Sequence, residues 1–223
     1  MDVDQVLQRL RALESPRDRE GMARFGINPD NALGISVAKL RGIAKETGRD
    51  HELALELWAS GIHEARILAT IVDDPKLVSK DQMQLWVEDF DSWDLCDQAC
   101  MNLFWRVEGS AELAIEWAAR DEEFVKRAAF ALVARFATKT AKAPDELLES
   151  FLPVIEQAAD DDRNFVRKAV SWALRGIGKR NAHLNRLAIE AGERIRSRDT
   201  RSARWIANDA LRELTSDKVK ARL

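Results

Sequence analysis

The sequence predicts an all-α protein, a curved solenoid of stacked helix pairs. Three observations support this fold class. Only 10 Gly and 5 Pro interrupt 223 residues. Apolar residues recur at helical spacing along most of the chain, without the alternation that is typical of strands. One segment also returns after a fixed interval, which is the mark of a repeat architecture.

The helical periodicity appears in both halves of the chain. Residues three and four positions apart share one face of a helix, so each apolar group predicts a buried helix face. The groups are Leu53, Leu57 and Trp58; Ile67, Leu68, Ile71 and Val72; and Phe124, Ala128, Ala131 and Leu132.

Short breaks separate these segments at regular intervals. The prolines and glycines that we place near helix ends are Pro16, Pro29, Pro75, Pro144, Gly48, Gly61 and Gly109. We expect Asp91 or Ser92 to cap the helix that carries Trp93, and Asp162 to cap the helix that carries Trp172. The spacing predicts roughly a dozen helices joined by short turns.

An internal repeat links two of the predicted helices. Residues 124–129 read FVKRAA and residues 165–170 read FVRKAV, and each segment follows an acidic turn. The offset of 165−124=41 residues fits helix pairs of HEAT or armadillo size. Such pairs stack into an array with a concave binding surface, and we expect one repeat domain over residues 1–223.

Each copy of the repeat carries two adjacent basic residues near the start of its helix, Lys126-Arg127 and Arg167-Lys168. A helix N-terminus favours phosphate, because its unpaired N–H groups and its dipole add to the side-chain charge. The alternative is that these bases only neutralise the acidic turns before them.

Charge is distributed unevenly along the chain. The formal net charge is −3, but residues 160–223 hold 16 Lys+Arg against 9 Asp+Glu, a balance of 16−9=+7. The other residues then hold 19 bases and 29 acids, a balance of −10. A basic C-terminal third suggests a surface for a polyanion. An ordinary solvated charged face explains the same numbers.

Several other classes of protein are disfavoured. We expect no signal peptide and no membrane segment, and a reducing cytoplasm fits the two cysteines, Cys96 and Cys100. These cysteines are expected to be small buried side chains rather than metal ligands, since no histidine lies beside them. Glycine-rich phosphate loops and Gly-x-Ser-x-Gly turns are absent from the sequence.

The segment most suggestive of chemistry is Trp93 to Asp97. The two residues are four apart, so an indole and a carboxylate share one helix face. Trp172 follows Lys168 at the same spacing. A core tryptophan beside an exposed aspartate is the simpler alternative.

These segments resemble the AlkD-like DNA alkylation repair glycosylases. The resemblance covers most of the chain, in the same order. It rests on Trp93-Asp94-Leu95-Cys96-Asp97, on the two copies of the repeat, on Ser171-Trp172-Ala173-Leu174-Arg175, on Phe25-Gly26-Ile27, and on Leu57-Trp58 with His63-Glu64-Ala65-Arg66.

The resemblance implies a C-shaped HEAT-like array that cradles duplex DNA and hydrolyses the N-glycosidic bond of cationic alkylated purines such as 3-alkyladenine and 7-alkylguanine. By position, Asp97 would be the catalytic carboxylate, Trp93 and Trp172 would flank the lesion, and Arg127 would hold a phosphate. The other DNA-binding candidates are Lys126, Arg167, Lys168 and Arg175.

We therefore expect a monomeric cytoplasmic enzyme that acts on duplex DNA of the nucleoid and uses no cofactor and no metal. Trp93, Arg127 and Trp172 are expected on helices of successive pairs, with their side chains converging on one concave surface. Two alternatives stay open: a non-catalytic helical-repeat protein that binds nucleic acid, and a protein-binding scaffold.

Overall fold

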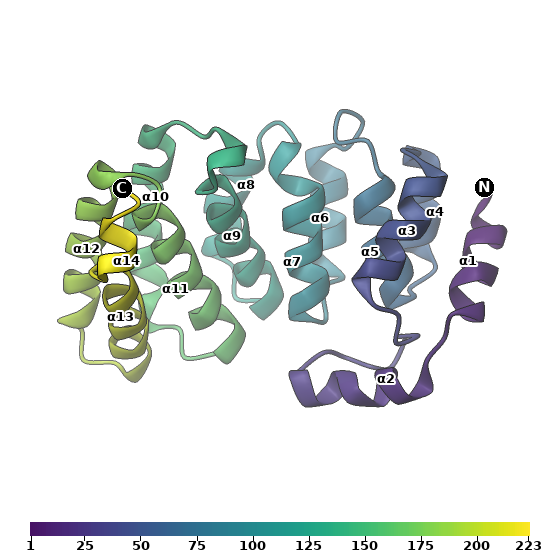
Figure 1. Cartoon of the computed structure of the whole chain (residues 1–223), viewed down its shortest axis with the longest axis horizontal. Helices are drawn as coiled ribbons and strands as arrows, with labels where there is room; N and C mark the ends of the chain where they lie inside the picture. Colours follow the sequence, from purple (N-terminus) through teal and green to yellow (C-terminus); the bar gives the residue numbers. More distant parts are fainter. The chain divides into compact units, whose positions relative to one another are not determined.

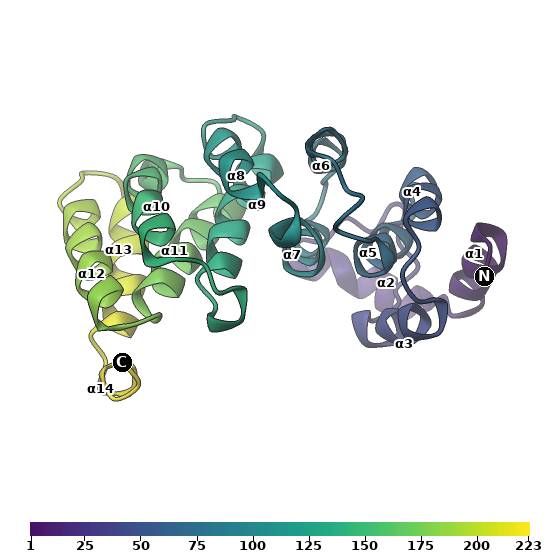
Figure 2. The ribbon, with the colours of Figure 1, turned by 90° about the horizontal axis from the view of Figure 1, so that it is seen from above.

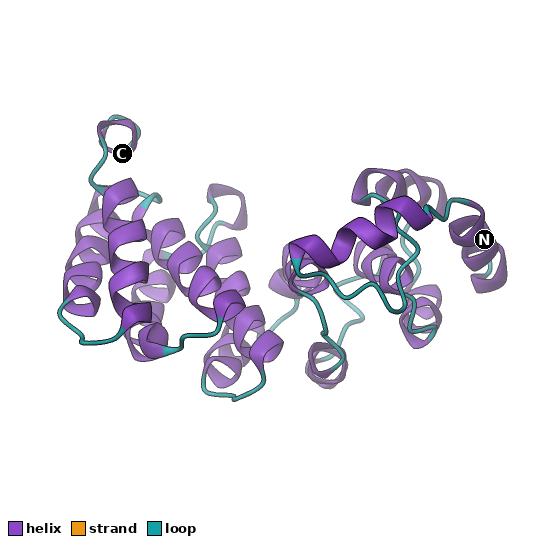
Figure 3. Cartoon of the chain, turned by 90° about the horizontal axis from the view of Figure 1, so that it is seen from below, coloured by secondary structure: helices purple, strands orange, loops and turns teal.

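The chain is entirely helical in a computed structural model that describes residues 1–223 (Figure 1). Coloured by secondary structure, it contains helices and loops only (Figure 3). The α-helices are α1 (Val3–Ala12), α2 (Pro16–Met22), α3 (Val37–Thr47), α4 (His51–Ala59), α5 (His63–Val72), α6 (Lys80–Glu88), α7 (Trp93–Asn102), α8 (Ser110–Ala118), α9 (Glu123–Phe136), α10 (Asp145–Gln157), α11 (Asn164–Gly178), α12 (Ala182–Arg196), α13 (Arg201–Leu214) and α14 (Asp217–Lys220). Four short 3₁₀ helices join them: η1 (Ala23–Phe25), η2 (Phe104–Arg106), η3 (Lys139–Ala141) and η4 (Ala158–Asp160).

The helices form two compact units, unit 1 (residues 1–108) and unit 2 (residues 109–223). In unit 2, α8/α9, α10/α11 and α12/α13 are successive antiparallel pairs (Figure 2). The helices α9, α11 and α13 pack against one another in sequence, and α10 contacts both α8 and α12. Unit 2 is therefore a two-layered stack of helix pairs, as the sequence predicts. That the whole chain is one repeat domain stays a prediction.

The internal repeat places equivalent residues in contact. Phe124 starts α9 and Phe165 starts α11, and their ring centroids lie 5.7 Å apart. Val125 and Val166, the next residues in each copy, are both buried. The matching sequence thus reflects matching positions in adjacent helix pairs, because each copy must bury the same face against its neighbour.

In unit 1, α5 is central and contacts α3, α4 and α7. Aromatic rings fill much of this core: Trp58 of α4 and Trp86 of α6 stack with ring centroids 3.9 Å apart, and Phe90 lies beside Trp58. The short helix α2 runs crosswise to the helices that follow it (Figure 1). None of the helices is both long and apolar enough to cross a membrane.

The predicted helix starts are partly confirmed. Ser92 is the N-cap of α7, but its side chain does not cap the helix. The prediction for α11 is wrong, because Arg163 and not Asp162 is the N-cap. The neighbouring Asp161 carboxylate accepts hydrogen bonds from the backbone and the side chain of Arg163, which fixes the turn before the helix.

Candidate functional site

Trp93 and Asp97 lie one turn apart near the start of α7, on a helix whose other face is core. Both side chains are half-buried, whereas Leu95, Cys96, Ala99 and Cys100 are fully buried. The burial of the two cysteines confirms that they are small core residues. The indole and the carboxylate therefore share the boundary between the core of unit 1 and the solvent.

The indole of Trp93 is held in place by the segment that follows α2. Its Nε1–H donates a hydrogen bond of 2.9 Å to the backbone carbonyl of Phe25, the last residue of η1. The next residue, Gly26, has a left-handed backbone with φ of 71°, which turns the chain there. Because its donor is engaged by the backbone, the ring of Trp93 has a defined orientation.

Two further hydrogen bonds tie the start of α7 to the same segment. The hydroxyl of Ser92 accepts from the backbone N–H of Asn28 at 2.8 Å, and the carboxylate of Asp91 accepts from the Asn28 side chain at 2.8 Å. Ser92 is completely buried. Its hydroxyl is used for this cross-link, which explains why it does not cap the helix.

Behind the start of α7, Asp94 is paired with a buried histidine. The imidazole of His63, only 5% exposed at the start of α5, lies 2.9 Å from the Asp94 carboxylate. Burial alone would lower the pKa of His63, but the hydrogen bond and charge of Asp94, with the charges of Glu64 and Asp91, outweigh it and raise that pKa. This contact, which is an ion pair when His63 is protonated, joins the start of α5 to the first turn of α7.

The neighbouring acid, Glu64, anchors the loop before α3. Its buried carboxylate accepts three backbone hydrogen bonds, from Leu33 and Gly34 at 2.7 Å and from Ile35 at 3.1 Å. Gly34 has φ of 75°, and a Cβ there would lie 2.4 Å from the carbonyl oxygen of Ser15. Only glycine fits this close contact between the loop and the start of α2.

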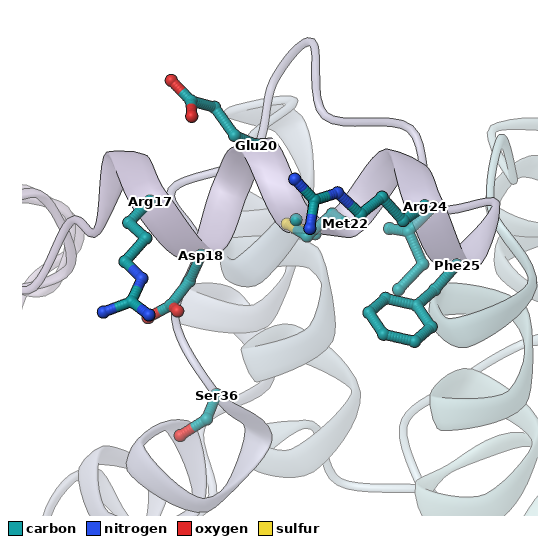
Figure 4. A pocket seen from close by; sticks show the side chains of 9 residues that line it. Arg17, Asp18, Glu20, Met22, Arg24, Phe25 and Ser36 are labelled. Carbon is teal, nitrogen blue, oxygen red and sulfur yellow. The ribbon is translucent and has the colours of Figure 1, made fainter.

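The same part of unit 1 contains a cavity of about 830 Å³ around α2 and η1. The side chains of Arg17 and Phe25 lie on opposite sides of it, and Ser36 belongs to its lining (Figure 4). Phe25 is 71% exposed, which is unusual for a large aromatic side chain. The backbone carbonyl of Phe25 accepts the hydrogen bond from the indole of Trp93, so the exposed phenyl ring lies on the segment that orients Trp93.

In unit 2, the structure places Arg127 inside the helix stack. Its side chain is 6% exposed and donates from Nη1 to the backbone carbonyl of Phe165 at 2.8 Å. This bond joins α9 to the first turn of α11. Arg127 thus has a definite structural partner, and a role in phosphate binding stays a prediction.

The adjacent bases also have partners within unit 2. Lys126 lies 3.4 Å from Asp161, which belongs to the acidic turn of the next helix pair and not to the one before Lys126. The guanidinium of Arg167 lies over the ring of Trp205, 5.0 Å from its centroid. These contacts stabilise the stack of helix pairs.

The remaining candidates lie along α11. Trp172 is half-buried, and Lys168, one turn before it, is exposed and has no acidic partner in the structure. Arg175 lies 2.9 Å from Glu213 and 3.4 Å from Asp209, both on α13. Of the bases predicted to bind DNA, Lys168 is the most accessible.

The predicted residues thus fall into two groups. Trp93 and Asp97 share α7 in unit 1, while Arg127 and Trp172 lie on the packed helices α9 and α11 of unit 2. Within unit 2, α9 and α11 are the second helices of two successive pairs, α8/α9 and α10/α11. That both groups act at one surface stays a prediction.

The sequence places Phe25 and His63 in segments that resemble the family but does not show their contacts with Trp93 and Asp94, and it gives no indication of Asn28, which bonds to Ser92. Each contributes through a contact with a residue that is at least 31 positions away, and two of these contacts involve the backbone. Neither periodicity nor motif spacing carries such information. The exposure of Phe25 also has no signal in a sequence that contains seven Trp and eight Phe.

Comparisons with known proteins agree with this architecture. A solved structure of a new family of proteins related to the HEAT-like repeat DNA glycosylases with affinity for branched DNA structures superposes with a TM-score of 0.78. It is 20% identical, and the match covers 96% of this chain and 95% of that one. An engineered protein gives a TM-score of 0.48 at 15% identity, covering 94% of this chain and 98% of its own. The first of these matches confirms the predicted fold of HEAT-like helix pairs.

A comparison with curated proteins gives no significant match. The profile of a protein family, described as DNA alkylation repair enzyme, matches residues 6–214. This range covers most of both units and every candidate residue from Trp93 to Arg175. The chain therefore belongs to the DNA alkylation repair enzyme family.

Proposed function

We propose that this protein is a DNA glycosylase that hydrolyses the N-glycosidic bond of cationic alkylated purines, such as 3-alkyladenine and 7-alkylguanine, in duplex DNA. The observation that carries the proposal is the pairing of Trp93 and Asp97 on one half-buried face of α7. Their chain belongs to a family of DNA alkylation repair enzymes.

The chemistry follows from the charge of the lesion. An N-alkylated purine leaves readily because it departs as a neutral base, and the sugar becomes an oxocarbenium-like cation. A fixed carboxylate such as Asp97 stabilises that cation and orients a water molecule for attack. Partial burial strengthens the interaction, since the local dielectric constant is lower than in water.

The aromatic residues have a complementary role in this proposal. The electron-rich face of an indole attracts cationic groups and the polarised C–H edges of a sugar. Trp93 is suited to this because its N–H is bonded to the Phe25 carbonyl, so the ring need not be reordered when DNA binds. We propose Trp172 as the second aromatic residue of the site.

Phosphate contacts are assigned to the bases of unit 2. Lys168 requires no rearrangement, whereas Lys126 and Arg175 must exchange an acidic partner for a phosphate. Arg167 would have to leave the ring of Trp205 or bind while stacked on it, and Arg127 would have to become more accessible. We propose that the protein works as a cytoplasmic monomer with water as nucleophile and without metal or organic cofactor.

A second candidate function is the binding of structured DNA without catalysis. The observation in its favour is the similarity of fold to the protein family with affinity for branched DNA structures. Such a protein would bind a four-way junction more tightly than a linear duplex of the same sequence, and its binding would not depend on Asp97.

The deciding experiment uses a duplex with a single 7-methylguanine. Abasic sites are converted to strand breaks with alkali and counted over time, with wild-type protein, with Asp97→Asn and without protein. Base release above the spontaneous rate with wild-type protein, but not with Asp97→Asn, supports the glycosylase proposal. Wild-type protein that is folded, binds a four-way junction and releases no base would establish the second function instead.

A further inference from the structure

A second cavity in unit 1, of about 280 Å³, lies at the C-terminal end of α7. Three arginines line it, and no carboxylate does. The full lining is Arg41, Arg49, Ile71, Met101, Asn102 and Arg106. The arginines come from α3, from the loop before α4 and from η2, so the fold brings Arg106 beside two cations that are more than 50 residues earlier in the chain.

The side chain of Arg106 is held in place by two contacts. The guanidinium of Arg106 donates from Nη1 to the backbone carbonyl of Asn102, the last residue of α7, and lies over the ring of Trp105. The side chain of Asn102 in turn donates to Thr70 and to Gln98, both at 3.1 Å. These hydrogen bonds fix the side chain of Asn102 at the end of α7, where it lines the cavity.

The positive charge of the cavity is largely uncompensated. Arg41 is exposed and has no acidic partner in the structure. Arg49 has one, Asp74, at the long distance of 3.4 Å, with 56% of the Arg49 side chain exposed. The pKa of Arg106 is lowered, mainly by partial desolvation of its guanidinium and to a smaller extent by the charge of Arg49. Like charges that approach one another destabilise a fold unless an anion lies between them.

Another basic cavity, in unit 2, differs in this respect. Lys139, Lys179, Lys218 and Arg222 line it together with Glu213. The carboxylate of Glu213 lies 2.8 Å from Lys179 and supplies an internal anion. The cavity of unit 1 has no such group among its lining residues.

We infer that Arg41, Arg49 and Arg106 bind a phosphate of the DNA backbone. Guanidinium groups present paired N–H donors that match phosphate oxygens, and three of them can surround one phosphodiester. The inference rests on the proposed function in taking DNA as the partner. It adds a phosphate contact in the unit that carries Trp93 and Asp97.

The position on α7 suggests where this phosphate lies relative to the lesion. Asn102 follows Asp97 by five residues, which is about 7.5 Å along the helix axis. Successive phosphates of one strand advance by about 3.4 Å along the duplex axis. We therefore place the contacted phosphate close to the nucleotide at Asp97, on the same strand or across the groove.

The test scans a duplex in which one phosphate at a time is replaced by an uncharged methylphosphonate. Wild-type protein should lose about tenfold in affinity at one linkage near the lesion. The double variant Arg41→Gln/Arg106→Gln should bind the native duplex about tenfold more weakly and be insensitive at that linkage. Its plot of log affinity against log salt should be flatter by about 0.9.

Two variants make this scan interpretable. Arg11→Gln, an exposed arginine of α1 in the same unit, should behave as wild type. If the double variant does not fold, Arg49→Gln replaces it, because that side chain is mostly exposed. Folded arginine variants that bind the native duplex as wild type does, with the same sensitive linkages, would overturn the inference.

A second measurement separates this inference from the glycosylase proposal. Inorganic pyrophosphate should raise the melting temperature of wild-type protein and of Arg11→Gln, and not that of the double variant. Such a result without any release of 7-methylguanine would retain the anion site and reject the glycosylase. Equal shifts, or no shift, in all three proteins would reject the anion site even if base release is observed.

Discussion

The charge of a single carboxylate, Asp97, is the most specific element of the proposed mechanism. In Asp97→Asn the side chain keeps its size and its half-buried position, so the protein should remain folded. The release of 7-methylguanine should fall by on the order of 10²-fold, because only the charged form stabilises the cationic transition state over the ground state. Single-turnover release at saturating protein measures this.

Asp81→Asn is the matched control for that experiment. Asp81 is an exposed acid in the first turn of α6, so the substitution removes the same charge from the same unit. Base release should be unchanged. If Asp97→Asn unfolds the protein, Asp97 has a structural role. If base release is unchanged in the folded variant, Asp97 takes no part in catalysis.

Replacing Arg127 tests whether this buried side chain stabilises the fold. Its replacement by Ala leaves the carbonyl of Phe165 without this donor and opens space between α9 and α11. We expect the free energy of unfolding to fall by at least about 1–3 kcal/mol, as measured by urea denaturation. Lys168→Ala, at an exposed position of α11, should stay within about 0.5 kcal/mol of wild type. Equal stability of the two variants would contradict the buried position of Arg127.

His63 predicts a dependence of stability on pH. Its pKa is raised in the folded protein, so the folded state binds the proton more tightly than the unfolded state does. The stabilisation is complete below the unfolded value of about 6.5 and is lost as the pH rises through the raised pKa. Urea denaturation at several pH values should show this loss in wild type and not in His63→Gln. Parallel profiles for the two proteins would exclude the ion pair with Asp94.

Single residues are also where sequence reasoning is weakest. Trp58, Trp86 and Trp117 are core residues, whereas Trp93 and Trp172 are half-buried, and all five stand in helical segments with apolar neighbours. Spacing along one helix cannot distinguish these cases, because burial depends on which neighbouring helix covers the residue. Only the resemblance to a family indicates that Trp93 and Trp172, unlike the core tryptophans, belong to a functional site.

At the scale of elements, a close approach of α11 and α13 can be tested through a glycine. A Cβ at Gly178 of α11 would lie 2.6 Å from a methyl carbon of Leu214, which is fully buried and has little room to move. Gly178→Ala should therefore destabilise the protein by about 1–3 kcal/mol. Thermal and urea denaturation should agree on the direction.

Gly42 of α3 provides the opposite case. A Cβ there meets nothing within 4 Å, and the residue is exposed inside a helix. Gly42→Ala should stabilise the protein by about 0.5–1 kcal/mol, because alanine loses less backbone entropy on folding. Should both alanine variants change stability in the same direction, the contact between α11 and α13 would be wrong.

The elements themselves could be predicted because their signals are local. The repeat at residues 124–129 and 165–170 predicted equivalent helices, and Phe124 and Phe165 do lie in contact. The start of α11 was misplaced by one residue, since Asp161 forms its hydrogen bonds with Arg163 and leaves Asp162 outside the helix. Competing hydrogen bonds between nearby polar residues decide such boundaries, and their outcome depends on the folded turn.

For the whole molecule, the structure changes the meaning of the basic C-terminal third. Many of its bases pair with acids of adjacent helix pairs, as Arg194 does with Glu156 and Arg198 with Asp160. These pairs link neighbouring helix pairs, and their charges are compensated internally. The formal balance of +7 already counts most of these paired acids, so what a polyanion would meet depends on which bases are accessible rather than on the total.

The last prediction concerns Lys168, an accessible basic residue of the C-terminal third. It is exposed, has no acidic partner and lies one turn before Trp172 on α11. Each phosphate contact contributes about −0.9 to the slope of log affinity against log salt. Lys168→Gln should flatten the slope by about that amount, weaken binding equally on unrelated sequences, and leave single-turnover base release at saturating protein unchanged. Lys80→Gln, at an exposed position of α6, is the control and should retain the wild-type slope. An unchanged slope for Lys168→Gln, together with normal affinity, would show that DNA does not contact this turn of α11.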